Sequence, residues 1–259
     1  MKKLLLGNEA IARGAYEAGV RVSSAYPGTP STEINENVAT YPEIYSEWAP
    51  NEKVAVEVAL GAAVSGARSL ACMKHVGLNV AADPFFTATY TGVNAGMVVV
   101  VADDPGMHSS QNEQDTRMLA RASHAPVLDP SNSQECKDFL KLAYEISEKY
   151  DTPVILRVTT RIAHARTLVE LDERVEVPLR EYKRDIKKYV SMPANMIARH
   201  LYVEEREKKL AEDANTLPIN RIEWADRKIG VITSGAAYNY VKEAMPTASV
   251  LKLGLAYPM

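Results

Sequence analysis

The sequence has few cysteines and no long apolar run. Its 259 residues include two cysteines, Cys72 and Cys136, far apart in the chain. Two thiols cannot form a disulfide framework or supply the four thiolates of an iron–sulfur cluster. No apolar stretch approaches the roughly 20 residues that span a bilayer. The formal net charge of −3 indicates no general attraction to nucleic acid or to an anionic membrane.

Common leader and nucleotide motifs are also missing. The initial MKKLLL run is too short for a signal peptide, and Asn8, Glu9 and Arg13 follow at once, so we expect a cytoplasmic protein. No G-x-G-x-x-G follows the first strand, and there is no G-x-x-x-x-G-K-[ST] or G-x-S-x-G, which removes the main support for dinucleotide, P-loop and hydrolase functions. Four histidines show no metal-ligand spacing with each other or with acids: His108, His124, His164 and His200.

Short apolar runs alternate with helix-like segments up to about residue 160. This alternation predicts an α/β fold with a parallel sheet covered by helices on both faces and joined by right-handed crossovers. The continuous apolar run Met97–Ala102 is typical of a central strand. Further strands are expected at Val20–Tyr26, Ser69–Met73, Pro126–Asp129 and Pro153–Val158. Helices are expected at 7–19, 54–66 and 78–90. A further helix is expected to start at its cap Ser31 and run through Val38, and another to cover 133–148 with Ser133 as its cap.

The composition changes after this block, and we divide the chain into three parts. Residues 1–165 form the first domain, and 166–227 form a charged, solvated connector with one amphipathic helix near 197–212. Residues 228–259 read as the start of a second α/β domain: a strand at Lys228–Thr233, a helix at 236–244 and a strand at 249–253. Because a strand–helix–strand unit cannot bury both faces of its sheet, we expect this domain to be incomplete, or completed by another chain.

Two motifs stand at the carboxyl ends of predicted strands, where open α/β sheets bind ligands. The first, AYPGTPST at 25–32, has two prolines that stiffen the turn, and Thr29 offers a hydroxyl. The second is MKHVGLN at 73–79, which contains His75. The alternatives are an ordinary strand–helix turn for the first, and a surface or internally satisfied histidine for the second.

Glu52 starts a helix of mostly small and apolar residues. It is either a first-turn acid favoured by the helix dipole or a buried acid that faces a ligand. The small residues of 54–66 allow close approach, which predicts a homodimer or a larger complex with this helix near the contact; packing within the chain is the alternative.

A polar run, DDPGMHSSQNEQDTR at 103–117, follows the most apolar strand. So many polar residues at that position indicate a binding site or a partner surface rather than a solvated loop, since function concentrates in loops on a rigid sheet. Arg117 could hold a carboxylate through two parallel hydrogen bonds.

In order and spacing, these motifs resemble the 2-oxoacid:ferredoxin oxidoreductase family over roughly residues 1–165. The polar run is most similar to the large (alpha) subunit of the indolepyruvate branch. The resemblance implies the pyrimidine-binding domain of a thiamine diphosphate enzyme. It also implies oxidative decarboxylation of arylpyruvates such as indolepyruvate to acyl-CoA, with ferredoxin as electron acceptor. The motif strings that carry it are YPGTPST, NEKVAVEVALGAAVSGAR and MVVVVADDPGMHSSQNEQDTR.

Three roles follow from the resemblance. Glu52 matches the catalytic acid that hydrogen-bonds the aminopyrimidine ring nitrogen of thiamine, fourteen residues before Gly66. Thr29 matches the threonine near cofactor and substrate, and Arg117 matches the arginine that receives the 2-oxoacid carboxylate. We also place His75 among the cofactor-binding residues, from its position at a strand end.

The family's diphosphate–metal motif and its cysteine motifs are absent from this sequence. We therefore expect the diphosphate and Mg2+ site outside this chain, and the iron–sulfur clusters in missing parts or in a partner. The expected partners are a diphosphate-binding domain or subunit, a second oxidoreductase subunit, ferredoxin and coenzyme A. Alone, the chain should be inactive. The alternatives are a noncatalytic assembly module and the equivalent subunit for pyruvate or 2-oxoglutarate.

Overall fold

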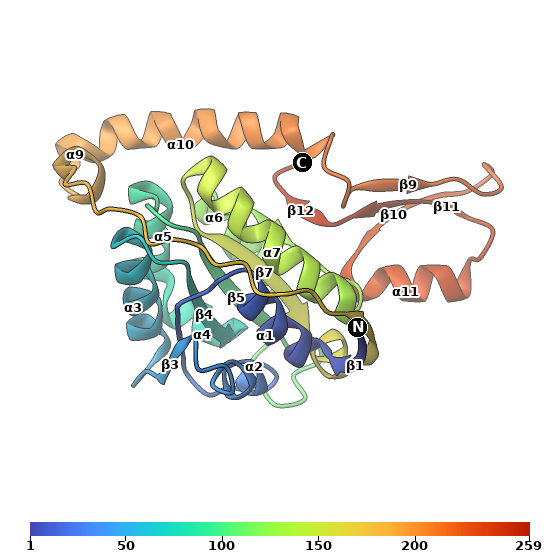
Figure 1. The fold of residues 1–259 in the computed structure, drawn as a ribbon. Coiled ribbons are helices and arrows are strands. Elements are labelled where there is room, and N and C mark those ends of the chain that lie inside the picture. The colour runs from blue at the N-terminus through green and yellow to red at the C-terminus, as the bar shows by residue number, and fades with distance from the viewer.

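A seven-stranded, mostly parallel sheet forms the centre of the molecule in the computed structural model, which describes residues 1–259 (Figure 1). The strand order is β12-β6-β7-β5-β4-β2-β3, and only β12 runs antiparallel to its neighbour. The expected α/β fold is thus confirmed. The strands are β2 (Val22–Ala25), β3 (Tyr45–Trp48), β4 (Ser69–Lys74), β5 (Met97–Asp103), β6 (Val127–Leu128), β7 (Val154–Thr159) and β12 (Leu255–Tyr257).

Helices cover both faces of this sheet. The central strand β5 is buried at all seven positions between β4 and β7, as its apolar sequence predicts. One face packs against α1 (Gly7–Glu17), α2 (Thr32–Val38) and α7 (Ser133–Tyr150), and forms a core of 33 buried residues. The other face forms a core of 16 buried residues with α3 (Glu52–Val64), α4 (His75–Val80), α5 (Ala82–Thr91) and α6 (Thr116–Ser123).

Ser31 stands at the predicted N-cap position of α2 but does not cap with its side chain, and the predicted Ser133 cap is wrong. The Ser31 hydroxyl donates to the carbonyl of Gly28 at 2.7 Å, so it closes the preceding turn instead of accepting from α2. At α7 the cap is Asn132, one residue before the predicted Ser133, and its side chain accepts from Glu135 N at 2.9 Å. Asparagine and serine cap helices about equally well, so propensity does not decide which of these two residues caps α7. The helix predicted at 78–90 is two helices, α4 and α5, that meet at Ala81.

Three short strands had no clear signal in the sequence. The edge strand β3 has polar residues, and none of its four positions is fully buried. Strand β1 (Lys2–Leu6) pairs antiparallel with β8 (Arg166–Glu170) in a separate two-stranded sheet. After β7 and the short helix α8 (Thr160–His164), the chain thus comes back beside its amino-terminal strand.

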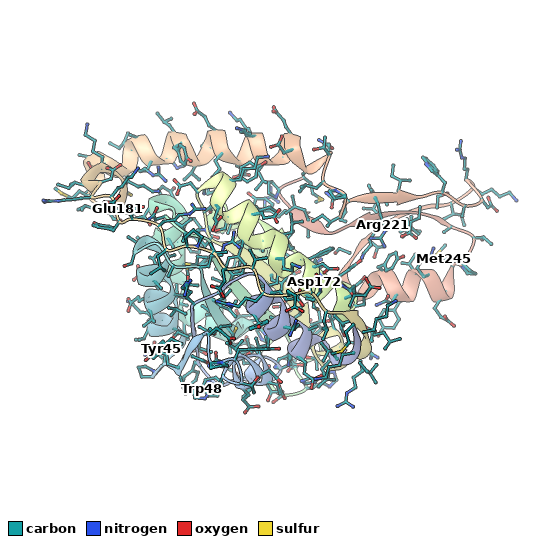
Figure 2. The ribbon with its side chains drawn as sticks, in the orientation of Figure 1. Tyr45, Trp48, Asp172, Glu181, Arg221 and Met245 are labelled. Carbon is teal, nitrogen blue, oxygen red and sulfur yellow. The ribbon has the colours of Figure 1, made fainter.

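The charged connector lies on the core rather than free in solvent. Beyond β8 it crosses the first domain as an extended segment, on which Asp172 and Glu181 lie, and reaches α9 (Ile186–Tyr189) and α10 (Pro193–Ala214) (Figure 2). Arg174 donates to the carbonyl of Tyr16 at 2.8 Å, and Arg180 pairs with Glu148 at 2.6 Å. Some of its charges therefore satisfy groups on the core, while most residues of 171–202 are exposed, as expected for a solvated connector.

The last part of the chain forms a small sheet that projects from the body. It contains β9 (Arg221–Glu223), β10 (Gly230–Ser234) and β11 (Ser249–Leu253), with α11 (Gly235–Ala244) on one face (Figure 1). On the opposite face Ile222, Leu251 and Ile232 form one cross-strand row, in which Ile222 is 55% exposed and Ile232 is 69% exposed. The chain then returns to the main sheet as β12. The three-part division into 1–165, 166–227 and 228–259 remains a proposal.

No helix of the chain combines the length and apolarity that a membrane crossing requires.

Candidate functional site

The predicted site residues gather at the carboxyl ends of the central strands. Strand β4 lies between β2 and β5, with Cys72 opposite Ala25 and Lys74 opposite Ala102. The turn after β2, the start of α4 after β4 and the polar loop after β5 therefore meet at one edge of the sheet. This is the edge at which parallel α/β sheets bind their ligands.

Glu52 is buried, with 7% of its surface exposed, in the first turn of α3. Asn51 caps this helix by accepting from Val54 N at 3.1 Å, so it fixes the position from which Glu52 projects. Within the chain the Glu52 carboxylate makes no hydrogen bond or ion pair. It lies against Gly77 of α4, where an added Cβ would come 2.6 Å from Glu52 Oε1. The carboxylate oxygens keep some contact with solvent although the residue is largely buried, so the acid is placed to face a ligand rather than to act only as a first-turn acid.

The Thr29 turn lies beside the same strand end. Gly28 N donates to Thr32 Oγ1 at 2.9 Å, and Asn8 donates to the carbonyl of Pro30 at 2.8 Å, so both ends of the turn are fixed. Gly28 packs on the aliphatic stem of Lys74, 3.0 Å from where a Cβ would stand. The Thr29 side chain is exposed and its hydroxyl makes no hydrogen bond within the chain.

His75 is buried, and both of its ring nitrogens bond to the backbone of the polar loop. Nδ1 accepts from Asp104 N at 3.3 Å, so the proton sits on Nε2, which donates to the carbonyl of Asn112 at 3.0 Å. Its polar atoms are therefore engaged in holding the loop. Contact between His75 and a cofactor remains a prediction, and the carbon edge of the imidazole ring is the part that could make it.

The polar loop folds around a second buried residue, Asp104. Its carboxylate accepts from Ser109 N and from the Ser110 hydroxyl, both at 2.8 Å, and from the Thr160 hydroxyl at 3.0 Å. Burial opposes ionisation, but these donors hold the pKa of Asp104 below its ordinary value. Lys74 adds a bond to the carbonyl of Ser109 at 2.7 Å. The loop is therefore ordered although most of its side chains are exposed.

Arg117 lies away from Glu52, at the start of α6. Its guanidinium pairs with Asp115, with Nε 2.9 Å from Oδ1 and Nη2 2.7 Å from Oδ2. Burial raises the pKa of Asp115, but its bonds to Arg117 and the nearby charge of Arg157 reduce it below the ordinary value. No direct contact joins Arg117 to Glu52, Thr29 or His75. The loop that His75 holds connects the two groups.

The motifs did not include two of the charged residues beside Arg117, Arg157 and Asp129, and gave no role to Asp103 at the start of the polar run. Arg157 of β7 lies between Asp103 at the end of β5 and Asp129 just after β6, with distances of 2.7 Å and 3.3 Å. Each stands at or near the carboxyl end of a strand, and that position was the available signal. Because the three lie far apart in the sequence, the ladder register was needed to bring them together.

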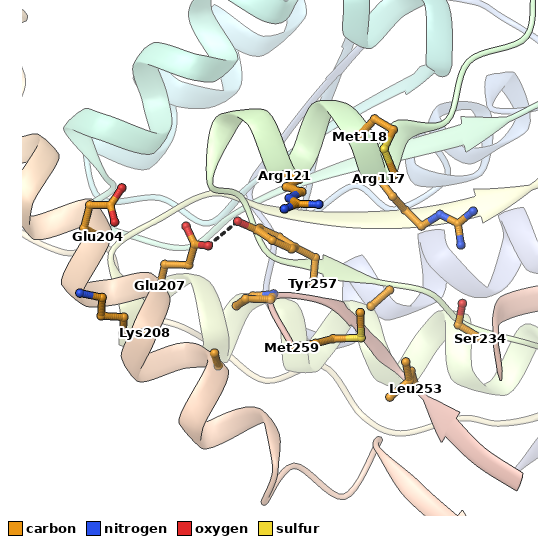
Figure 3. Close-up of a pocket in the computed structure, with 13 residues that line it drawn as sticks. Arg117, Met118, Arg121, Glu204, Glu207, Lys208, Ser234, Leu253, Tyr257 and Met259 are labelled. Carbon is orange, nitrogen blue, oxygen red and sulfur yellow. Dashed lines mark hydrogen bonds between the residues drawn. The ribbon is translucent and has the colours of Figure 1, made fainter. Parts of the chain in front are cut away.

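Arg117 lies at the junction of three cavities. One, of about 620 Å³, is bounded by Glu204, Glu207 and Lys208 of α10 and by the terminal segment, where the Tyr257 hydroxyl donates to Glu207 at 2.6 Å (Figure 3). The second, of about 400 Å³, is also lined by Arg157, and the third, of about 490 Å³, is lined by charged and polar residues and Pro105. Glu52, Thr29 and His75 line none of the five main cavities.

The family described as "Pyruvate flavodoxin/ferredoxin oxidoreductase, thiamine diP-bdg" matches residues 13–220. The chain belongs to this oxidoreductase family. The match includes Glu52, the Thr29 turn, His75 and Arg117, and it confirms the resemblance stated from the motifs.

Within this oxidoreductase family the chain is similar over nearly its whole length to subunits named for indolepyruvate. It is 48% identical over 273 residues to the indolepyruvate oxidoreductase subunit IorA of Pyrococcus horikoshii, covering 100% of this chain and 42% of that protein. The IorA subunit of Methanothermobacter marburgensis is 49% identical over 264 residues, covering 98% and 43%. The chain thus spans less than half the length of these relatives. The 2-oxoglutarate synthase subunit KorA of Methanothermobacter thermautotrophicus is 31% identical over 180 residues, covering 66% and 48%.

A solved structure shares the fold at much lower identity. It is the 2-oxoglutarate:ferredoxin oxidoreductase from Magnetococcus marinus with 2-oxoglutarate, coenzyme A and succinyl-CoA bound, with a TM-score of 0.81 and 21% identity. The similarity covers 100% of this chain and 54% of that one, so it extends to the projecting terminal part.

Proposed function

We propose that the chain provides the thiamine-pyrimidine site of an indolepyruvate-type 2-oxoacid:ferredoxin oxidoreductase. The proposal is carried by Glu52, a largely buried residue at the carboxyl edge of a sheet of the matching family, whose carboxylate has no partner in the chain. Its neighbour Gly77 has no side chain, which leaves the carboxylate at the surface of α4 instead of enclosing it. An acceptor so placed fits a ligand with a ring N–H or a protonated ring nitrogen.

In this proposal Glu52 holds a proton at the aminopyrimidine ring nitrogen. When bound, thiamine diphosphate supplies the carbon nucleophile and the electron sink for oxidative decarboxylation of the 2-oxoacid. The protein's contribution is a fixed acid: the Asn51 cap and the Gly77 contact set its position, and partial burial strengthens the hydrogen bond it makes.

Thr29 and Arg117 are proposed to bind the 2-oxoacid. The Thr29 hydroxyl is exposed at the strand edge shared with Glu52, where it can reach cofactor or substrate. Arg117 presents a planar guanidinium that suits a carboxylate, but Asp115 already occupies two of its donors. Substrate binding must therefore compete with Asp115 or use the remaining N–H groups. We place His75 at the cofactor edge, where its two backbone bonds position the loop that leads to Arg117.

The remaining steps are assigned to other parts of the enzyme. We propose that a diphosphate-binding domain or subunit holds the diphosphate with Mg2+. Iron–sulfur clusters outside these 259 residues would pass electrons to ferredoxin, and coenzyme A would take the acyl group. The two cysteines of this chain are buried and free. We further propose a cytoplasmic location and an oligomeric enzyme with a second oxidoreductase subunit.

A substrate panel tests the proposed function. With the complete enzyme, kcat/KM for indolepyruvate should exceed that for 2-oxoglutarate and pyruvate, and Glu52→Gln should reduce all three. A preference for 2-oxoglutarate would favour the alternative that the KorA similarity raises. Full turnover by Glu52→Gln would instead indicate a noncatalytic assembly module.

A further inference from the structure

Three buried charged side chains lie side by side where β5, β7 and β6 end. Arg157 is the middle member. Its Nε donates to Asp103 Oδ2 at 2.7 Å, and its Nη1 donates to Asp129 Oδ2 at 3.3 Å. All three residues are buried. We call Asp103, Arg157 and Asp129 the carboxylate row.

The carboxylate row places two carboxyl groups against one guanidinium in a buried position. Burial raises the pKa of Asp129 while the guanidinium of Arg157 opposes this, so removing Arg157 would leave two buried carboxyl groups without the cation that bonds both of them. Such an arrangement costs more than a well-packed apolar one, so fold stability alone does not account for it. Its other contacts show what it holds.

One end of the row fixes the start of α6. Asp103 accepts from the backbone N of Thr116 at 3.3 Å and also from the Thr116 hydroxyl. From the outer side, Asp115 caps the same turn by accepting from Arg117 N at 3.0 Å. The first turn of α6, from which the Arg117 side chain projects, is thus held by these two aspartates.

The other end of the row fixes α11. Asp129 accepts from the Ser234 hydroxyl at 2.8 Å. It also lies against Gly235, whose φ is +51° and where an added Cβ would come 2.5 Å from Asp129 Oδ1. The cavity of about 400 Å³ that Arg117 lines lies between these two ends, with Arg157 and Ser234 in its wall.

We propose that Arg157 is a positioning residue for Arg117. It holds Asp103 in place, Asp103 holds Thr116, and Thr116 fixes the first turn of α6 so that the guanidinium of Arg117 faces the cavity. Its hold on Asp129 keeps the α11 wall of that cavity at a set distance. The proposal rests on the proposed function in one respect, namely that Arg117 receives the 2-oxoacid carboxylate.

The test compares the buried Arg157 with a partly buried arginine, Arg68, in the complete enzyme. Arg157→Lys keeps the charge but cannot span both carboxylates in the same geometry. Arg68→Lys is the matched control: Arg68 holds Glu148 through two bonds of 2.8 Å and 3.0 Å at the amino ends of the strands, with no contact to α6. The readouts are steady-state kinetics with the 2-oxoacid and hydrogen–deuterium exchange of residues 115–119 without substrate.

We expect Arg157→Lys to raise KM for the 2-oxoacid about tenfold, the effect of a weakened charged hydrogen bond, with little change in kcat. Amide exchange at Thr116 should rise, and Arg68→Lys should change neither. Thr116→Val, which leaves the buried charges intact, should shift KM in the same direction, and Thr116→Ser should restore it. These two variants keep the test valid if Arg157→Lys folds poorly.

Unchanged exchange at Thr116 in Arg157→Lys would overturn the proposal, as would an equal KM shift in Arg68→Lys. Exchange is measured without substrate, so it separates two failures. If exchange rises but neither Arg157→Lys nor Arg117→Ala changes KM, the positioning of Arg117 stands and its substrate role in the proposed function falls.

Discussion

Gly77 lies directly against the Glu52 carboxylate. A methyl group at position 77 would stand 2.6 Å from Oε1 and 2.7 Å from Cγ, so the Glu52 side chain or one of the two helices would have to move. The pair joins α3 and α4 at the edge where the ligand is proposed to bind. Position 77 therefore reports on the site without altering any polar group.

Gly77→Ala should impair the cofactor site while leaving the chain folded. Displacement of Glu52 by even an ångström is expected to reduce activity of the complete enzyme about 10²-fold. Gly230→Ala is the matched control, because an added Cβ there meets nothing within 4 Å. Activity and circular dichroism of both variants check this. Equal activities in the two variants would contradict a role for the Gly77 contact.

Arg117→Ala should weaken 2-oxoacid binding and spare the cofactor. Loss of a guanidinium–carboxylate contact should raise KM about 30-fold or more, with near-normal exchange of the cofactor C2 proton. Asp115→Asn should do the opposite and lower KM, since it keeps a helix cap but removes the competing charge. Initial-rate kinetics with varied 2-oxoacid measure both. A KM that rises in Asp115→Asn would mean that Asp115 presents Arg117 instead of competing for it.

The outer surface of α3 is the predicted contact between chains. Its inner residues pack on the sheet, but Gly61 faces open space, and an added Cβ there touches nothing. Gly61→Leu should therefore leave one chain folded and disrupt close packing of α3 against another. Light scattering at high protein concentration should show a smaller assembly for Gly61→Leu than for the wild type. An unchanged mass would place the contact elsewhere, and a monomeric wild type would remove it.

Protonation of Glu148 should reduce the stability of the fold in acid. Burial raises its pKa, but Arg68, Gly96 N and Arg180 together hold the pKa below the ordinary 4.5. The stabilisation is therefore fully present above pH 4.5 and is lost as the pH falls through the lower folded-state pKa. Glu148→Gln should lose about 2 kcal/mol at pH 7 and show a flatter decline below pH 4.5. Urea unfolding at pH 7 and pH 3.5 measures this, and parallel declines in the two proteins would contradict it.

The sequence predicted the elements whose burial is symmetric or clearly one-sided. Strand β5 is apolar throughout because both of its faces are covered, and α7 has a regular apolar face. Strand β3 was missed because an edge strand with polar residues, YSEW, has no such pattern. The choice of Asn132 over Ser133 as a cap depends on where the chain leaves β6, which propensity does not encode.

The candidate site was predictable only where each residue stands in a motif of its own. Glu52, Thr29, His75 and Arg117 each stand in a motif at the end of a predicted element. The carboxylate row joins residues 103, 129 and 157, and a shift of one residue in strand register would separate them. The engagement of His75 with two backbone groups also required three-dimensional structure.

Exchange of the cofactor C2 proton in Glu52→Gln tests the central claim most directly. The change is nearly isosteric, but an amide cannot hold the proton that Glu52 is proposed to share with the ring nitrogen. In the complete enzyme the exchange rate should fall by about 10² to 10⁴, the usual contribution of one positioned acid–base group, with little change in 2-oxoacid affinity. Exchange at the wild-type rate would show that Glu52 is only a first-turn helix acid.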